Sequence, residues 1–305
     1  MTDSTAALRH QIASATDLQS VVRTMRALAA SEIHQYEQSV LALTAYRQTV
    51  EQGLGACLRG ALIVPEVEME RATAPAKAAT VGVIVFGSDQ GLVGQFNEII
   101  VEHVVAALRA IPGPRKVWAV GERVQERLAD AGIAVAVFHP LPTAVEGIAP
   151  LVEHLLLDAE THASQSASPR IEIFHNRPLA GALYETLQQR LLPLDASWRA
   201  RLMRQPWPQA QLPQAQLPQV MGSAGATLRA LIREHLFISL FQACAESLAS
   251  ENASRLAAMQ RADQNIDDLL TELRGRFHRQ RQDSIDEELF DVTAGYVALA
   301  NDGTS

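Results

Sequence analysis

The sequence has few cysteines and no long apolar run. Only Cys57 and Cys244 occur in 305 residues, and the opening stretch MTDSTAALRH lacks the charged-then-apolar pattern of a secretion signal. We therefore expect a chain that stays in a reducing compartment, as a bacterial interior provides. No stretch of 18 or more apolar residues occurs, so we expect any membrane contact to be made through a partner.

Clustered positive charge and metal-ligand spacing are also missing. The formal net charge is −8, and the 26 basic residues are spread along the chain, which argues against a surface for nucleic acid. The nine histidines form neither HExxH nor a paired Cys/His pattern. We expect no metal ion, no cofactor and no nucleic-acid partner.

The first sixty residues contain no proline and keep a heptad repeat. Twelve of fifteen heptad positions are apolar, which is typical of a coiled-coil seam. The fifteen positions are Leu8, Ile12, Ala15, Gln19, Val22, Arg26, Ala29, Ile33, Tyr36, Val40, Leu43, Arg47, Val50, Leu54 and Cys57. The pattern predicts one long helix within residues 1–62, which must pack against an element of similar length.

A second long segment without proline lies at the other end, within residues 225–300. Its first half, HLFISLFQACAESLA, is apolar nearly all round, and its second half carries a narrower apolar stripe. We expect the two long helices to pair antiparallel as a coiled coil, with Val22 and Met25 opposite residues 270–277. A helical bundle within one globule is the alternative.

Between the helices, short apolar runs alternate with helical patterns over residues 78–200. The expected strands are TVGVIVF, KVWAV, IAVAVF and IEIFH, and the expected helices include EIIVEHVVAALRA, GERVQERLADAG and GALYETLQQRLL. This alternation predicts an inserted, Rossmann-like α/β domain with a mainly parallel sheet. Residues 201–224 include PWPQAQLPQAQLPQ, whose regular prolines predict an extended linker.

The glycine-rich stretch VFGSDQGLVGQFN raises the question of a phosphate-binding loop. Its glycines do not have the G-x-G-x-x-G spacing, and it has no lysine for a P-loop. Ser88 and Asp89 are turn-forming and helix-capping residue types, and an aspartate without a nearby cation would repel phosphate. We therefore expect the loop to serve the turn into the next helix.

Three stretches resemble the γ subunit of the rotary F-type ATP synthase. VFGSDQGLVGQFN resembles its strand and S-D-R-G-L-C-G-x-x-N segment, and LRHQIASATDLQSVVRTMRALAAS resembles its amino-terminal helix. SLASENASRLAAMQRADQNIDDLL, followed by RQRQDSIDEELFDVTAGYVAL, resembles its carboxyl-terminal helix. The stretches occur in the family's order, and LQSVVRTMRALAA with YEQSV is closer to the alternate, N-type subgroup.

The resemblance implies a mechanical role for the chain. In that family the terminal helices form a central stalk inside a ring of α and β subunits, and the α/β domain forms a foot beside the ε subunit and the c-subunit ring. The chain would have no active site of its own. It would couple ion translocation to ATP synthesis or hydrolysis, as a peripheral subunit on the cytoplasmic face of the bacterial inner membrane.

Partner-contact or shaft positions carry over only where the motifs match. They are Arg23, Met25, Ser250, Glu251, Arg255, Arg281 and Gln282. The sequence departs from the family pattern at Glu32, where lysine is usual, and at Gln90 and Val93 in the loop. Two other hypotheses remain open, a nucleotide-binding α/β protein with helical arms and a coiled-coil scaffold that dimerises.

Overall fold

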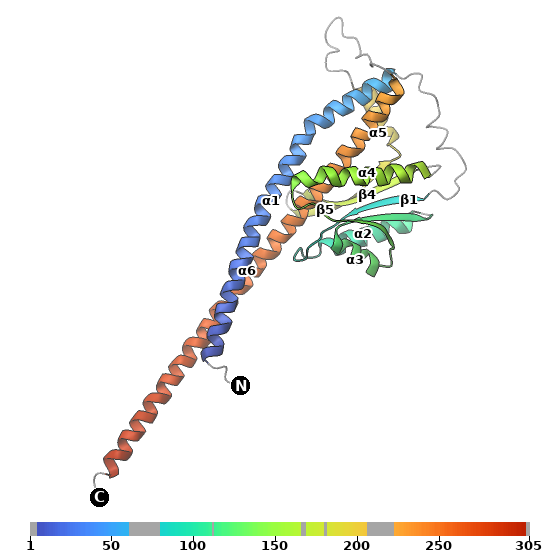
Figure 1. Ribbon diagram of the computed structural model, residues 1–305. Helices are drawn as coiled ribbons and strands as arrows, with labels where there is room; N and C mark the ends of the chain where they lie inside the picture. Colours follow the sequence, from blue (N-terminus) through green and yellow to red (C-terminus); the bar gives the residue numbers. More distant parts are fainter. Residues whose placement is uncertain are drawn as a thin grey trace. The chain divides into compact units, whose positions relative to one another are not determined.

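The computed structural model describes residues 5–60, 80–111, 113–165, 169–179, 182–205 and 223–302 (Figure 1). The proline-rich stretch of the expected linker, from residue 206 to 219, lies outside the described residues. The chain divides into two compact units, residues 1–29 with 256–305 and residues 30–255.

Two long helices and a five-stranded sheet make up most of the described chain. The helices are α1 (Thr5–Gly60), α2 (Phe96–Ala110), α3 (Glu122–Asp130), α4 (Ile148–Gln165), α5 (Ala196–Arg204) and α6 (Ala224–Asp302), with a short 3₁₀ turn at Val145–Gly147. The strands are β1 (Val81–Phe86), β2 (Arg115–Val120), β3 (Val135–His139), β4 (Arg170–Leu179) and β5 (Ala182–Leu192). The predicted fold class, α/β with long terminal helices, is confirmed.

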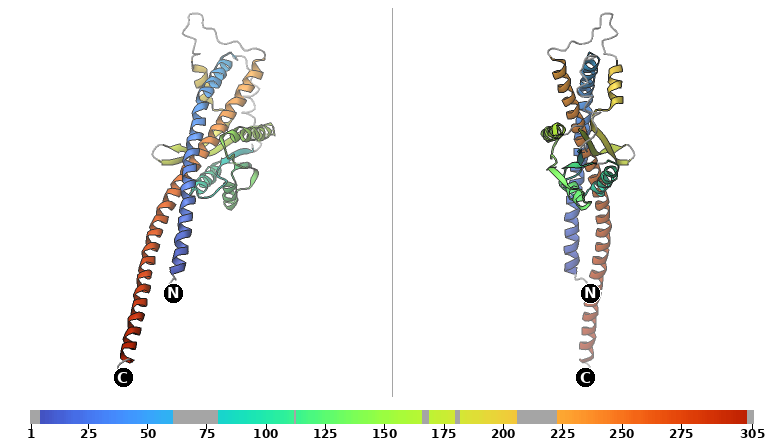
Figure 2. Two further views of the ribbon diagram at one scale, coloured as in Figure 1. Left: turned by 60° about the vertical axis from the view of Figure 1, so that its left-hand side comes forward. Right: turned by 90° about the vertical axis from the view of Figure 1, so that its right-hand side faces the viewer.

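In the unit of residues 30–255, the strands lie in the order β3-β2-β1-β4-β5. β1, β2, β3 and β4 are parallel, and β5 pairs antiparallel with β4. The hairpin of β4 and β5 continues past the end of β1, because Val85 pairs with Phe174 and β4 runs on to Leu179 (Figure 2).

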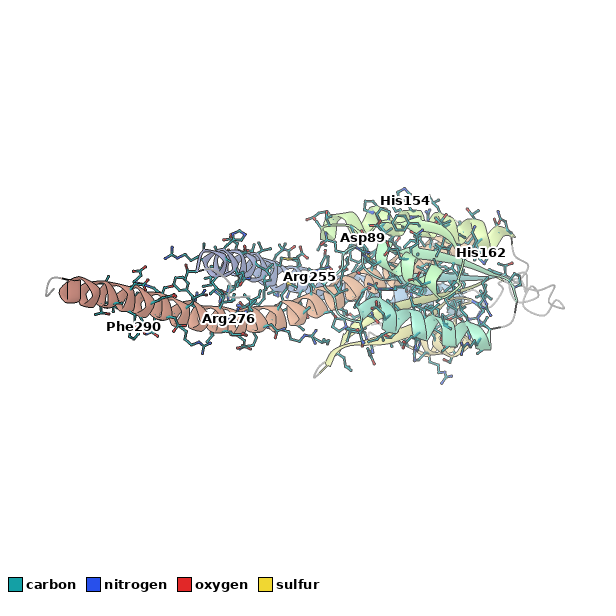
Figure 3. The ribbon with its side chains drawn as sticks, turned by 90° about the horizontal axis from the view of Figure 1, so that it is seen from below. Asp89, His154, His162, Arg255, Arg276 and Phe290 are labelled. Atoms are coloured by element: carbon teal, nitrogen blue, oxygen red, sulfur yellow. The ribbon has the colours of Figure 1, made fainter. Side chains whose placement is uncertain are left out.

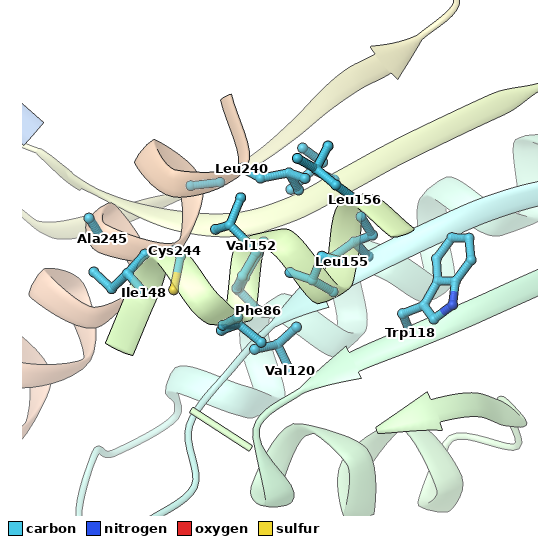
Figure 4. Packing of buried hydrophobic residues seen from close by; sticks show 14 of the residues in the cluster. Phe86, Trp118, Val120, Ile148, Val152, Leu155, Leu156, Leu240, Cys244 and Ala245 are labelled. Atoms are coloured by element: carbon cyan, nitrogen blue, oxygen red, sulfur yellow. The ribbon is translucent and has the colours of Figure 1, made fainter. Parts of the chain in front are cut away.

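Both faces of this sheet are covered by helices, so β1 reads VGVIVF without a polar residue. On one face, Val81, Val83 and Val85 pack against α2 and α3. On the other, Ile84 and Phe86 pack with Val152 and Leu155 of α4 and with Leu240 and Cys244 of α6 (Figure 4). This second core fixes part of α6 to the sheet.

One expected element is wrong. GALYETLQQRLL was predicted to be a helix, but Ala182–Leu192 forms strand β5. Leu, Gln, Glu and Arg are good helix formers, but intrinsic propensity is a weak preference, and pairing with β4 overrides it. Without β5, the backbone groups along the outer edge of β4 would have no strand partner.

In the unit formed by the chain ends, α1 and α6 lie antiparallel and side by side (Figure 2). Their apolar seam contains Ala15, Val22, Met259, Ile266 and Leu270. The antiparallel arrangement of this helix pair was predicted. The predicted register, with Val22 and Met25 opposite residues 270–277, is wrong. Arg23 and Arg26 both bond to Asp263, and Phe277 lies under Arg9 instead.

The register error has a physical reason. A heptad pattern repeats every seven residues, so sliding one helix by a heptad still matches apolar with apolar. The expected register differs from the observed one by about two to three helical turns. Polar side chains in the seam distinguish these registers, because each of them meets a polar partner on the facing helix in one register only.

Candidate functional site

The loop after β1 is held by a pair of buried polar side chains. The backbone N–H of Ser88 donates to Asn97 Oδ1 at 3.0 Å, and Asn97 Nδ2 donates to Ser88 Oγ at 2.8 Å. Ser88 Oγ in turn donates to the carbonyl of Gln90 at 2.9 Å. These bonds fix the turn against the first residues of α2.

Asp89 caps a helix, but not the one expected. Its Oδ1 accepts the backbone N–H of Glu122, the first residue of α3, at 2.8 Å, and its Oδ2 accepts the N–H of Leu141 at 2.9 Å. Helix α2, which follows the loop directly, has Gln95 at its N-cap and no side-chain cap. Asp89 therefore ties together three segments at the carboxyl ends of β1, β2 and β3.

The glycines of this loop make room for side chains and permit its backbone turn. A Cβ at Gly87 would lie 2.2 Å from Val124 Cβ and 2.7 Å from Asn97 Oδ1. Gly94 has φ 63°, in the left-handed region that favours glycine. Both carboxylate oxygens of Asp89 already accept backbone N–H groups, so the loop is arranged as a structural turn.

A row of polar contacts joins α6 to strand β4, and we call it the polar seam; it comprises His175, Asn176, Glu246 and Ser250. His175 Nε2 lies 2.9 Å from Glu246 Oε2, and Ser250 Oγ lies 3.1 Å from the Asn176 carbonyl and 2.8 Å from that of Glu246. The hydrogen bond from His175 lowers the pKa of Glu246, although burial acts in the opposite direction. Ser250, a position carried over from the resemblance, thus holds the shaft helix to the sheet.

Glu251, directly after Ser250, and Arg255, one turn further along α6, form a buried ion pair. Arg255 Nη2 donates to Glu251 Oε1 at 2.6 Å, and Nη1 donates to Asn252 Oδ1 at 2.9 Å. Burial raises the pKa of Glu251 to about 7, and Arg255 offsets part of that rise. Both side chains are almost fully buried within this unit.

Arg23 and Met25 belong to the other unit. Arg23 Nε donates to Asp263 Oδ1 at 3.1 Å, and Arg26 Nη1 donates to Asp263 Oδ2 at 2.9 Å. Met25 packs at the margin of the apolar seam. Arg23 remains half-exposed on the helix pair.

Arg281 and Gln282 are exposed on the last part of α6. Because Arg9 lies over Phe277 and α1 begins at Thr5, α6 continues beyond the first turn of α1 for about twenty residues. This overhang, which we define as residues 282–302, carries large apolar side chains in the open. They are Ile285, Leu289, Phe290 and Val292, with exposed fractions of 45%, 59%, 75% and 70%. Phe290 is labelled in Figure 3.

Comparison with known proteins identifies the family. A profile described as ATP synthase matches residues 4–299, nearly the whole chain. The ATP synthase gamma chain of Anaeromyxobacter sp. is 24% identical over 304 residues, which cover 96% of this chain and 98% of that one. The chain belongs to the ATP synthase γ-chain family. The γ chain of Moorella thermoacetica is also 24% identical, over 297 residues and the same shares of both chains.

Solved structures show that the fold of this γ-family chain is shared. A chain of the Euglena gracilis mitochondrial ATP synthase in rotational state 3 superposes with a TM-score of 0.60 at 14% identity, covering 99% of this chain and 96% of that one. A second Euglena chain, from the rotor in rotational state 1, gives a TM-score of 0.57 at 13% identity, covering 92% and 98%.

Among the described residues, no helix is long and apolar enough to cross a bilayer, and no three His, Cys, Asp or Glu side chains gather as metal ligands.

Sequence reasoning missed Asp263 and the His175–Glu246 pair. The signal for Asp263 was present, since Arg26 interrupts the apolar heptad and needs a polar partner on the facing helix. His175 and Glu246 carried no such signal.

Proposed function

We propose that this γ-family chain is the rotating central stalk of an F-type ATP synthase or ATPase. Its shaft would be residues 1–62 and 225–300, its foot residues 78–200, and its linker residues 201–224. Rotation of the shaft would couple ion translocation through the membrane sector to ATP synthesis or hydrolysis in a ring of α and β subunits. The foot would contact the ε subunit and the ring of c subunits.

The overhang of α6 is the observation that carries this proposal. Four large apolar side chains stand exposed on a helix that has passed the first turn of its α1 partner. Ile285, Leu289 and Val292 follow the i, i+4, i+7 spacing of one helical face, and such a patch is typical of a surface that packs against another protein. The inner wall of a surrounding subunit ring would cover it.

We place this rotor on the cytoplasmic face of a bacterial inner membrane, held there by its partners. The pattern of divergence around LQSVVRTMRALAA supports the N-type subgroup of these complexes. We assign Arg281 and Gln282 to contacts with the ring, because both are exposed where the overhang begins, Arg281 directly before it and Gln282 as its first residue. Ser250, Glu251 and Arg255 instead stabilise the shaft, since they are buried within the chain.

The proposal is tested by reversing one charge in the assembled complex. Arg281→Glu is expected to leave the isolated chain folded, because the side chain is exposed, but to weaken assembly or coupling by adding like-charge repulsion at the ring. ATP hydrolysis and ion pumping are measured side by side in the reconstituted complex.

The matched control is Arg229→Glu, an exposed arginine at the opposite end of the same helix. If Arg281→Glu left hydrolysis, pumping and assembly unchanged, the ring contact would be refuted. Two alternatives have their own assays. Tight nucleotide binding by the isolated chain would support a nucleotide-binding protein, and a dimer in analytical ultracentrifugation would support a coiled-coil scaffold.

A further inference from the structure

Helix α6 is buried on all sides where it packs on the sheet. Successive residues of a helix are turned by about 100°, so the buried apolar side chains between residues 236 and 249 surround the helix axis. They are Leu236, Ile238, Leu240, Ala243, Cys244, Ala245, Leu248 and Ala249. A helix that is apolar nearly all round has no single buried face, so burial alone does not determine the angle of α6 about its own axis.

The polar seam distinguishes one angle from the others. Glu246 and Ser250 are one turn apart on α6, and both face β4. Glu246 Oε2 lies 2.9 Å from His175 Nε2, and Ser250 Oγ donates to the carbonyl of Asn176 at 3.1 Å. All four residues belong to the unit of residues 30–255. These contacts form only when this stripe of α6 is turned toward β4.

The contacts continue from the polar seam to α1. Gln242, one turn before Glu246, donates to its carboxylate and accepts from Arg47 of α1. Burial acts to raise the pKa of Glu246, but the hydrogen bonds from His175 and Gln242 lower it below its usual value. An ionised carboxylate can only accept, so His175 must carry its hydrogen on Nε2. A chain of polar contacts thus runs from α1 through α6 to the sheet.

The members of the polar seam lie too deep to exchange their partners for water. His175, Asn176 and Ser250 are almost completely buried. Asn176 is also bonded to α2 and β5, because its Nδ2 donates to the Phe96 carbonyl at 3.4 Å and its Oδ1 accepts from Thr186 at 2.7 Å. If α6 turned on its axis, a buried carboxylate, a hydroxyl and an imidazole would lose their partners together, and each such loss is costly.

We propose that the polar seam, and not the apolar core, sets the angle at which α6 lies on β4. The inference goes beyond the rotor role, because it concerns the folded chain alone and holds whether or not the chain turns within a ring. It makes His175 and Glu246 positioning residues. Replacing both members of a buried polar pair by apolar side chains often leaves stability nearly unchanged, so their effect on position can be separated from an effect on stability.

The angle is measured in the full chain by pulsed electron paramagnetic resonance between two spin labels. The labels are attached at Ala230→Cys on α6 and Glu153→Cys on α4, which are exposed positions, whereas both native cysteines are buried. The native seam should give one narrow distance. In the double variant His175→Leu with Glu246→Met the narrow distance should be lost, while the midpoint of chemical denaturation stays close to that of the native seam.

Two control variants separate position from stability. His175→Gln keeps an N–H donor for Glu246 and should retain the narrow distance. Leu240→Ala removes apolar contacts between α6 and the sheet (Figure 4), so it should lower the denaturation midpoint without broadening the distance. A narrow, unshifted distance in the double variant would overturn the proposal, and so would equal broadening in Leu240→Ala.

A third variant tests the stability argument. Glu246→Met alone leaves the buried N–H of His175 without its acceptor, so it should have a lower denaturation midpoint than the double variant. A double variant that is less stable than Glu246→Met alone, or that does not fold, would show that the seam acts by stabilising the fold and would refute the positioning role.

Discussion

At the scale of single residues, Asp89 connects three segments of the sheet edge. One carboxylate accepts the N–H groups of Glu122 and Leu141, which belong to α3 and to the segment after β3. The residue type could be predicted from the sequence, because aspartate is a good helix cap. Which helix it caps could not, because α3 starts 33 residues further along the chain.

Asp89→Ala should therefore destabilise the α/β domain by about 1–3 kcal/mol, the usual effect of leaving N–H groups without a charged acceptor. Chemical denaturation of the full chain measures this. Glu102→Ala removes the same charge from an exposed position on α2 and should change stability by less than about 0.5 kcal/mol. Equal effects of the two substitutions would show that Asp89 is not a structural cap.

Three polar residues interrupt the apolar heptad of α1, and each has a polar partner on α6. Gln19 bonds to Asp267, Arg26 to Asp263 and Arg47 to Gln242. The interruptions were visible in the sequence, but their partners were not, because α6 offers many polar residues at similar spacing. These pairs explain how an otherwise repetitive seam can hold one register.

At the scale of elements, the helical spacing of apolar residues predicted the long helices, and short apolar runs predicted the buried strands. It failed at β5, where LYETLQQRLL has the residue types of a helix. A strand at the edge of a sheet lacks the apolar run that reveals β1, and its identity depends on a neighbour, β4, that local patterns do not include. The error is therefore one of tertiary context.

The helix pair of α1 and α6 offers a matched test of its seam. Leu270 is 2% exposed and its neighbour Leu269 is 46% exposed. Leu270→Ala should cost about 2–5 kcal/mol, because it removes buried methyl groups and leaves a cavity. Amide exchange of residues 8–28 should then accelerate markedly. Leu269→Ala should leave that exchange nearly unchanged, and a reversal of this order would contradict the observed seam.

At the scale of the whole molecule, the chain belongs to the γ-chain family over nearly its full length. Its cysteines suit a mechanical assay. Cys57 and Cys244 are both buried free thiols, and burial raises the pKa of each, which disfavours the reactive thiolate. A cysteine introduced at an exposed position can therefore be labelled selectively in the native protein.

Direct observation of rotation tests the central claim. The chain with Glu153→Cys on the exposed side of α4 is assembled with α and β subunits, the ring is fixed to a surface, and a bead is attached to the new thiol. During ATP hydrolysis the account predicts rotation of the bead in one direction, in three main steps per turn, if the proposed ring holds three α and three β subunits, as the resemblance implies. ATP hydrolysis by the labelled complexes with a stationary bead would contradict it.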